Sequence, residues 1–265
     1  MKIVELHYSS TNTYLIEGGR GILLFDTGYA GTLPAFFRAL KAAGIPAQEI
    51  SNVLISHFHP DHCGIAGEIA ELGPKIAVTD VQKAFLHAAD PVFAKEKKLH
   101  FTPIREEQVR VVPIPESREF LGELGISGEI LHTPGHSEDS ISLCLDSGDF
   151  FVGDLNPLYE LPLHRGTETA DSWEKLLSRQ PKTIYYGHAK TARIGSETPG
   201  AAEKDDRYRL AEKIMKCADR QMDLSKIRRK TGADPGFIED VLRMYLTHPG
   251  VSVQGILDRI EIKGK

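Results

Sequence analysis

Six consecutive residues near position 60 include four side chains that can bind a metal ion. They are His57-Phe58-His59-Pro60-Asp61-His62, an HxHxDH motif. Imidazole nitrogens and carboxylate oxygens suit zinc, and also iron or manganese. Four potential ligands in so short a run are more than one catalytic ion needs. The motif therefore predicts two divalent metal ions, with zinc as the first choice and iron or manganese as the alternatives.

Three further potential ligands each follow a short apolar run. They are His136, Asp154 and His188, and each has glycine immediately before it, where the backbone needs freedom to turn. Val53-Leu54-Ile55 precedes His57 in the same way. If these runs are strands that lie side by side, their polar ends converge at one edge of the sheets. Rigid strands that hold a site on their loops are the usual division between scaffold and function.

The elements that must position these residues alternate along the chain. Residues 90–107 are irregular and charged, and we expect a loop or short helices there, over the site. The predicted elements before it are strands at 13–17 and 22–25 around a glycine-rich turn, a helix at 33–43, a strand at 53–55, a helix at 64–72, a strand at 76–78 and a helix at 80–89.

Short strands return after residue 109, and only helical patterns follow Ser196. The later strands are predicted at 109–112, 129–132, 140–145, 150–152 and 183–186. Alternation in two halves favours sheets packed inside with helices outside. We therefore predict a catalytic domain over 1–195 and a helical C-terminal segment over 196–265, with apolar stripes such as that of Phe237, Val241 and Tyr245.

The composition is that of an ordinary globular protein. The chain has 265 residues, of which 41% are hydrophobic and 26% charged, and its net charge of −5 offers no general attraction for nucleic acid or anionic membrane. No apolar run approaches the roughly 18 residues that span a bilayer, and the charged start does not resemble a signal peptide. We predict a cytoplasmic protein whose three cysteines, Cys63, Cys144 and Cys217, are reduced and buried.

The order of the motifs carries a family resemblance. The HxHxDH run is followed by Thr133-Pro134-Gly135-His136, then Gly153-Asp154, then Tyr186-Gly187-His188. This set, spread over about residues 1–195, resembles the motif set of the metallo-β-lactamase superfamily. The resemblance implies an α+β fold, a four-layer αββα sandwich, here followed by the C-terminal helical segment.

The resemblance also implies a role for each candidate ligand. His57, His59 and His136 would hold one ion, while Asp61, His62 and His188 would hold the other. Asp154 would bridge the two ions. Asp26, in Phe25-Asp26-Thr27-Gly28, matches the family's acidic residue after the second strand, which orients the site without touching a metal.

Two cations about 3.5–4 Å apart share a water and lower its pKa, so that a bridging hydroxide forms near neutral pH. We expect it to attack a carbonyl or phosphoryl centre, with Asp61 as the catalytic residue that receives or relays the proton. Authentic β-lactamases of the superfamily replace the bridging carboxylate by Cys or Ser, so Asp154 argues against a β-lactam substrate. The full ligand set is instead similar to that of glyoxalase II, acyl-homoserine lactonases and the RNase Z group, and a small ester, thioester or lactone is the expected substrate.

The alternative is a phosphodiesterase or nuclease with a nucleic-acid-binding C-terminal segment, because the pattern of residues 224–246 resembles a helix-turn-helix. From Asp223 to Lys265 there are eight Lys/Arg and six Asp/Glu, a net charge of +2 that argues against phosphate-driven binding. We expect these helices to cover the substrate or to form a homodimer. The candidate pocket residues are Tyr29, Asn156, Tyr159 and His164.

Overall fold

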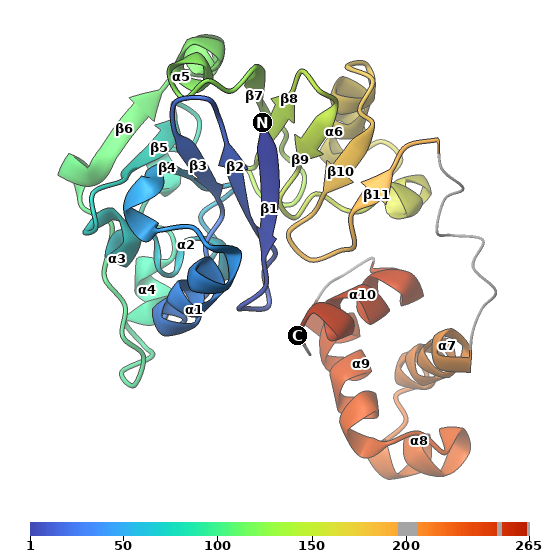
Figure 1. Cartoon of the computed structure of the whole chain (residues 1–265). Coiled ribbons are helices and arrows are strands. Elements are labelled where there is room, and N and C mark those ends of the chain that lie inside the picture. The colour runs from blue at the N-terminus through green and yellow to red at the C-terminus, as the bar shows by residue number, and fades with distance from the viewer. Residues whose placement is uncertain (196–205, 248–250, 264–265) are drawn as a thin grey trace.

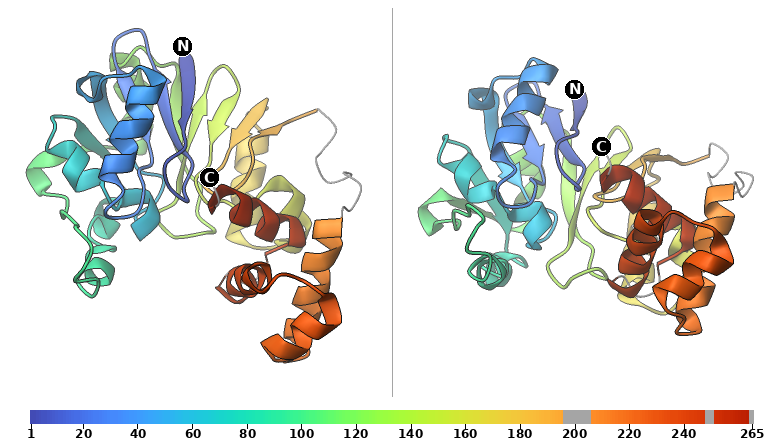
Figure 2. Two further views of the ribbon diagram at one scale, coloured as in Figure 1. Left: turned by 60° about the horizontal axis from the view of Figure 1, so that its bottom comes forward. Right: turned by 90° about the horizontal axis from the view of Figure 1, so that it is seen from below.

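Two β-sheets pack face to face, and helices cover both outer faces (Figure 1). The computed structural model of the chain describes residues 1–195, 206–247 and 251–263. A group of C-terminal helices lies beside one end of the sandwich (Figure 2). The predicted αββα architecture followed by a helical segment is therefore confirmed.

The first sheet has six strands, and the predicted hairpin of its second and third strands is confirmed. The pairs β1–β2 and β2–β3 are antiparallel, whereas the neighbouring pairs from β3 to β6 are parallel. β1 was not predicted, because it is an edge strand in which only Leu6 is buried, so its apolar pattern is weak. The strands, in spatial order, are β1 (Lys2–Leu6), β2 (Thr13–Glu17), β3 (Ile22–Phe25), β4 (Ile50–Leu54), β5 (Lys75–Thr79) and β6 (Val109–Val112).

The second sheet has five strands, and four of them lie where the sequence predicts strands. β9 and β10 are parallel, and the other neighbouring pairs are antiparallel. The short edge strand β11 was not predicted. In spatial order the strands are β11 (Ala192–Arg193), β10 (Thr183–Tyr185), β9 (Asp149–Phe151), β8 (Ile141–Leu145) and β7 (Gly128–His132).

The helices fall into an outer layer for each sheet and the C-terminal group. Helices of the sandwich are α1 (Leu33–Ala43), α2 (Pro60–Cys63), α3 (Ala66–Ala70), α4 (Asp90–Phe93), α5 (Ser117–Glu123) and α6 (Glu168–Leu177). Short 3-10 helices are η1 (Ala47–Glu49), η2 (Lys83–Phe85), η3 (Glu106–Gln108), η4 (Ile114–Glu116) and η5 (Leu158–Leu163). The C-terminal helices are α7 (Asp206–Asp219), α8 (Leu224–Thr231), α9 (Pro235–Thr247) and α10 (Val253–Lys263).

Two helix predictions need correction. The helix expected at 80–89 is wrong: the region holds only turns and η2, and Asp80 Oδ1 accepts a hydrogen bond from the Ile114 amide instead of capping a helix. The helix expected at 64–72 is shorter than predicted: α3 covers only residues 66–70, and it begins after Ile65, whose backbone lies outside the helical region at φ −116°. α5 and α6 lie where no helix was predicted. The short helices found within 90–107 agree with the expectation for that region.

Strand β3 shows why the sandwich strands read as continuous apolar runs. Leu23 and Phe25 face the space between the sheets, whereas Ile22 and Leu24 face the outer helices, and all four are buried. Strand side chains alternate between faces, so a strand covered on both sides is apolar at every position. Phe151 lies at the centre of the inner layer, with ring centroids 5.5 Å from Phe25 and 4.6 Å from Tyr185.

The C-terminal helices have an apolar core of their own. Ile214, Ile227, Val241 and Ile256, one from each helix, are almost fully buried in it. The predicted domain boundary at 195/196 adjoins residues 196–205, which lie outside the described residues, and stays a prediction. The three cysteines are free and buried, as predicted. Within the described parts of the chain, no helix is both long and apolar enough to cross a membrane.

The inner layer should be the main source of stability. Phe151→Ala removes a ring that is 0% exposed, so we expect it to lower the free energy of unfolding by about 3–5 kcal/mol. Phe37→Ala is the matched control, because that ring on α1 is 38% exposed; it should cost about 1 kcal/mol or less. Urea unfolding followed by circular dichroism measures both. Equal losses for the two variants would contradict this account of the core.

Candidate metal centre

The seven predicted ligands lie together at one end of the sandwich, just beyond the ends of four strands. His57 follows β4, His136 follows β7, Asp154 follows β9 and His188 follows β10. Of the other three, His59 lies directly before α2, and Asp61 and His62 lie within it. Their ligand atoms form three overlapping groups, each within 4.8 Å: His57, His59 and His136; His57, His62 and Asp154; and Asp61, His62 and His188.

The first group consists of three imidazoles. His59 Nδ1 lies 3.0 Å from His57 Nε2 and 3.0 Å from His136 Nε2. His57 is fully buried, whereas His59 is exposed, so this side of the site opens to solvent. The three ring nitrogens converge, and each can present a lone pair. Together they form a donor set suited to a cation such as zinc.

The group of Asp61, His62 and His188, called the second group from here on, combines two imidazoles with a carboxylate. His188 Nε2 lies 2.9 Å from Asp61 Oδ2 and 3.3 Å from His62 Nε2. His62 is fully buried, while the Asp61 side chain is 33% exposed. The group therefore offers a mixed nitrogen and oxygen donor set with one carboxylate accessible from solvent.

Asp154 lies between the two groups. Its Oδ2 is 3.5 Å from His136 Nε2 of the first group and 3.5 Å from His188 Nε2 of the second. Its Oδ1 is buried and, among the described residues, receives no hydrogen bond, although His62 Nε2 is 3.2 Å away. An orphaned buried carboxylate oxygen is costly unless a cation satisfies it. The residues present therefore fit the two divalent ions that the sequence predicts.

Hydrogen bonds on the far side of two rings fix which nitrogen faces the centre. His188 Nδ1 donates to the Ser10 carbonyl at 2.8 Å, and His62 Nδ1 lies 2.9 Å from Asp26 Oδ2. A ring whose Nδ1 carries the proton presents the lone pair of its Nε2. Both Nε2 atoms are the ones that face the other candidate ligands.

Asp26, which the resemblance predicts as an orienting residue, holds the turn that carries the HxHxDH motif. It is 1% exposed and has the left-handed φ of 60°. Its carboxylate accepts hydrogen bonds from the Ser56 amide at 2.6 Å and the Ser56 hydroxyl at 2.8 Å, besides its contact with His62. The placement agrees with an orienting contact, and the role itself stays a prediction.

Sequence reasoning missed Asp139, which connects two of the ligand loops. Its buried carboxylate accepts from the Phe58 amide at 2.7 Å and from the Ser137 hydroxyl at 2.7 Å. Phe58 lies between His57 and His59, and Ser137 follows His136. Asp139 thus fixes the spacing of the three imidazoles of the first group. A carboxylate three residues after a candidate ligand is too common a pattern to have shown this.

The glycines before the ligands serve two different purposes. Gly153 has the left-handed φ of 54°, as the expected turn requires. Gly187 is needed for space, because a Cβ there would lie 2.4 Å from Asp154 Oδ1 and 2.9 Å from His62 Cε1. The close approach of the β10 loop to Asp154 therefore depends on the missing side chain.

Burial keeps part of the site deprotonated. It lowers the pKa of His57 well below the usual value, and the neighbouring His62 lowers it further. Burial also lowers the pKa of His136 to about 4, although Asp154 opposes the shift. Neutral imidazole is the metal-binding form, so these two rings are ready to bind a cation at neutral pH.

The second group behaves in the opposite way. Burial would lower the pKa values of His62 and His188, but Asp154 and the other neighbouring carboxylates outweigh it and raise both pKa values. Burial would likewise raise the pKa values of Asp61 and Asp154, but the imidazoles outweigh it and lower both. A proton on either ring would neutralise the same carboxylates that a cation would neutralise.

The four candidate pocket residues have different surroundings. The Tyr29 ring packs against Phe93 with ring centroids 5.1 Å apart, and burial raises the pKa of its hydroxyl, with a further contribution from the charges of Glu96 and Asp61. Asn156 and Tyr159 instead donate hydrogen bonds to Glu160 and Asp258. His164 Nε2 is buried and has no partner among the described residues. A substrate contact for any of the four stays a prediction.

Comparison with known proteins gives a match over most of the chain. A family model described as the metallo-beta-lactamase superfamily matches residues 8–188. The beta-lactamase-like protein 2 homolog of Drosophila melanogaster is 30% identical over 191 residues, which are 67% of this chain and 58% of the fly protein. The atrochrysone carboxyl ACP thioesterase of Aspergillus fumigatus is 30% identical over 145 residues, 54% of this chain and 29% of that enzyme.

The matched part of this chain thus spans less than two thirds of either relative. Among solved structures, a metallo-beta-lactamase family protein from Thermus thermophilus resembles this chain with a TM-score of 0.57 and 18% identity. The likeness covers 99% of this chain and 94% of that one. At this identity it shows the fold, including the region of the C-terminal helices.

Metal uptake should release protons from the second group. Because the pKa values of His62 and His188 are raised, both rings hold protons in the metal-free protein at pH values below those raised pKa values. Binding must displace them, so we expect about one to two protons released per chain near neutral pH and an affinity that falls as the pH is lowered. Zinc titration by calorimetry in buffers of different ionisation enthalpy measures the release. Heats that do not depend on the buffer would contradict it.

Proposed function

This chain belongs to the metallo-β-lactamase superfamily, and from that premise we propose that it is a dinuclear metal-dependent hydrolase of a small ester, thioester or lactone. The observation that carries the proposal is the Asp154 carboxylate, which lies between the two ligand groups, with one buried oxygen that accepts no hydrogen bond of normal geometry among the described residues and has the His62 ring 3.2 Å away. A carboxylate in that position suits a bridge between two cations better than a structural role.

The ligand roles in the proposal follow the two groups. His57, His59 and His136 would hold one ion, and Asp61, His62 and His188 the other, with Asp154 shared. The ions, which we propose are zinc with iron or manganese as alternatives, would supply a water of lowered pKa and an electrophilic partner for the substrate oxygen.

The chain's own groups complete the chemistry. Substrate would enter on the side where His59 is exposed and Asp61 is one-third exposed. Asp61, whose pKa lies below its usual value, is ionised and can accept a proton during the attack on the carbonyl carbon. The Thr11 hydroxyl donates to the Asp61 carbonyl at 2.8 Å and holds this residue in place.

The proposed substrate class has support from a relative. The fungal protein that is 30% identical over part of its length is named an acyl carrier protein thioesterase. A thioester and a lactone both present an activated carbonyl, so one site of this kind suits either. A β-lactam is disfavoured, since Asp154 stands where β-lactamases of the superfamily have Cys or Ser.

A phosphodiester remains the alternative substrate, and one feature of the C-terminal segment favours it. Helix α8 carries four exposed cations in sequence, Lys226, Arg228, Arg229 and Lys230. In a helix-turn-helix, α9 would be the helix that enters the groove of the nucleic acid. However, α9 exposes Glu239 as well as Arg243. A basic α8 without a basic α9 gives weak support, so the ester-type substrate is preferred. The proposed cytoplasmic location and the possible homodimer rest on the sequence alone.

Removal of the shared carboxylate should affect both ions. For Asp154→Ala we expect bound metal to fall from about two ions per chain to one or fewer, and hydrolytic kcat to fall by about 100-fold or more. Elemental analysis after zinc loading and gel filtration measures the metal content. The control is Asp171→Ala, an exposed aspartate on α6 that belongs to none of the three ligand groups. Two tightly held ions and full activity in Asp154→Ala would refute the bridge.

A hydrolysis panel tests the substrate class. On zinc-loaded protein we expect kcat/KM for a short acyl thioester or a lactone to exceed that for bis(p-nitrophenyl) phosphate and for a β-lactam by about 100-fold or more. The panel should be run at low and moderate salt with single-stranded RNA included. Salt-sensitive RNA cleavage together with no acyl hydrolysis would replace the proposal by the nuclease alternative.

A further inference from the structure

Helix α10 meets the sandwich at the two loops that follow Asp154 and His188. Among the C-terminal helices in Figure 2 it lies nearest to the sandwich. Asp258 of α10 accepts a hydrogen bond from the Tyr159 hydroxyl at 3.0 Å, and Glu261 of α10 pairs with Lys190 at 2.7 Å. Both loops supply candidate ligands of the second ion or of the bridge.

Glu160 forms the tightest part of this contact. It is 0% exposed, its Oε2 accepts from Asn156 Nδ2 at 3.0 Å, and its Oε1 accepts from the Ser252 amide at 2.7 Å, just before α10 begins. One carboxylate therefore connects the start of α10 to a side chain two residues from Asp154.

Asn156 is held from two directions. Its side chain donates to Glu160, and its carbonyl accepts from Trp173 Nε1 of α6 at 2.8 Å. Trp173 is fully buried in the core between α6 and the second sheet, so its indole is a rigid donor. Any shift of α10 that moves Glu160 must therefore strain the segment between Asp154 and Asn156.

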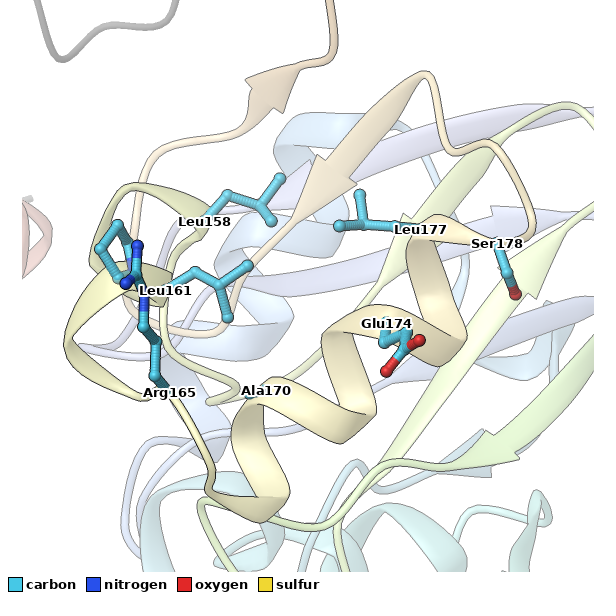
Figure 3. A pocket seen from close by; sticks show the side chains of 8 residues that line it. Leu158, Leu161, Arg165, Ala170, Glu174, Leu177 and Ser178 are labelled. Carbon is cyan, nitrogen blue, oxygen red and sulfur yellow. The ribbon is translucent and has the colours of Figure 1, made fainter.

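The other side of η5 packs on α6. Leu158 and Leu161 of η5 pack against the core cluster that includes Trp173 and Leu176 of α6. An open pocket of about 710 Å³ lies beside this contact, with Leu158, Leu161 and Leu177 among its lining residues (Figure 3). Because close packing fixes a segment in place, η5 is held both by apolar packing on α6 and by its hydrogen bonds to the α10 region.

Stability alone does not account for the polar character of the contact. Glu160 and Asp258 are 0% and 3% exposed. Burying carboxylates is costly even when they are hydrogen-bonded, and apolar side chains of similar size often stabilise such a place more. Directional hydrogen bonds do fix the register of one element on another, which apolar packing does less well.

We propose that α10 is a clamp that positions the metal centre, with Glu160 as the positioning residue that sets the Asp154 loop relative to the His188 loop. This gives the C-terminal segment a role in the second ion's affinity that is separate from covering the substrate. The inference rests on the proposed dinuclear site. It concerns residues that touch neither a metal nor the substrate.

Glu160→Gln tests the clamp with little change in shape. The new amide cannot accept hydrogen bonds from both Asn156 and Ser252, so one donor is left unpaired. We expect the second equivalent of Zn²⁺ to bind about 10-fold more weakly or worse, as is usual when a ligand's supporting contact is lost. The first equivalent should be affected less, because only the second ion would take both Asp154 and His188 as ligands. Glu239→Gln, an exposed site on α9, is the matched control and should bind both ions as the unaltered protein does.

A second substitution should rescue the first. In Glu160→Gln combined with Asn156→Asp, the amide and the carboxylate exchange places, so the new amide donates to the new carboxylate while its oxygen still accepts from Ser252. We expect the second Zn²⁺ affinity to return to within about 3-fold of that of the unaltered protein. Asp258→Asn, which weakens the contact with Tyr159, is the further variant in case Glu160→Gln does not fold.

Zn²⁺ titration against a chromophoric chelator gives the two affinities, and hydrogen exchange in the metal-free protein gives a readout that needs no metal. We expect amides of residues 155–163 to exchange about 10-fold faster in Glu160→Gln and Asp258→Asn than in the control. Unchanged second-ion affinity and exchange in the folded variants would overturn the clamp, as would an equal weakening of both ions. A control protein that binds fewer than two ions would overturn the dinuclear site instead, while the exchange rates would still decide whether α10 restrains the loop.

Discussion

The metal centre depends on placing many polar groups with unshared electron pairs at the end of an apolar sandwich. Asp154 and His62 are nearly or fully buried, and their contacts with each other and with His136 and His188 are between 3.2 and 3.5 Å. Such a cluster is unfavourable without positive charge, because each buried donor or acceptor loses its water. In the metal-free chain protons on His62 and His188 can supply this charge, because the neighbouring carboxylates raise the pKa values of both rings. Divalent ions would supply it more completely, so the cluster's own electrostatics favour metal.

Two buried carboxylates keep this cluster in shape from outside. Asp26 accepts a hydrogen bond from the Ser56 amide and contacts the His62 ring. Asp139 accepts a hydrogen bond from the amide of Phe58, which lies between His57 and His59. Both accept backbone amide hydrogen bonds, which are strong when the acceptor is charged and buried. The ligand loops are therefore fixed by hydrogen bonds to the scaffold and not by metal alone. These hydrogen bonds can preserve the geometry of the site whether or not ions and substrate are bound.

The contact between the C-terminal helices and the sandwich also depends on buried carboxylates. Their own apolar core, with Val241 and Ile256 at its centre, lets them fold as a compact unit. Their contact with the sandwich is polar and centred on Glu160, next to the Asp154 loop. An interface of this kind has a defined register at modest cost in stability. The segment is thus attached where it can influence the site, although it supplies none of the seven candidate ligands.

The sequence by itself determined the fold class, most strands and the seven clustered side chains, because alternation, glycine positions and ligand spacing are local patterns. It did not determine β1, an edge strand paired through its backbone, or the region 80–89, where Asp80 hydrogen-bonds the Ile114 amide instead of capping a helix. The orienting contacts of Asp139 and the engagement of Asn156 and Tyr159 with Glu160 and Asp258 also needed the tertiary structure. Each of these contacts joins segments that are brought together only by the packing of the two sheets and of a helix distant in sequence. No local sequence pattern encodes such long-range contacts.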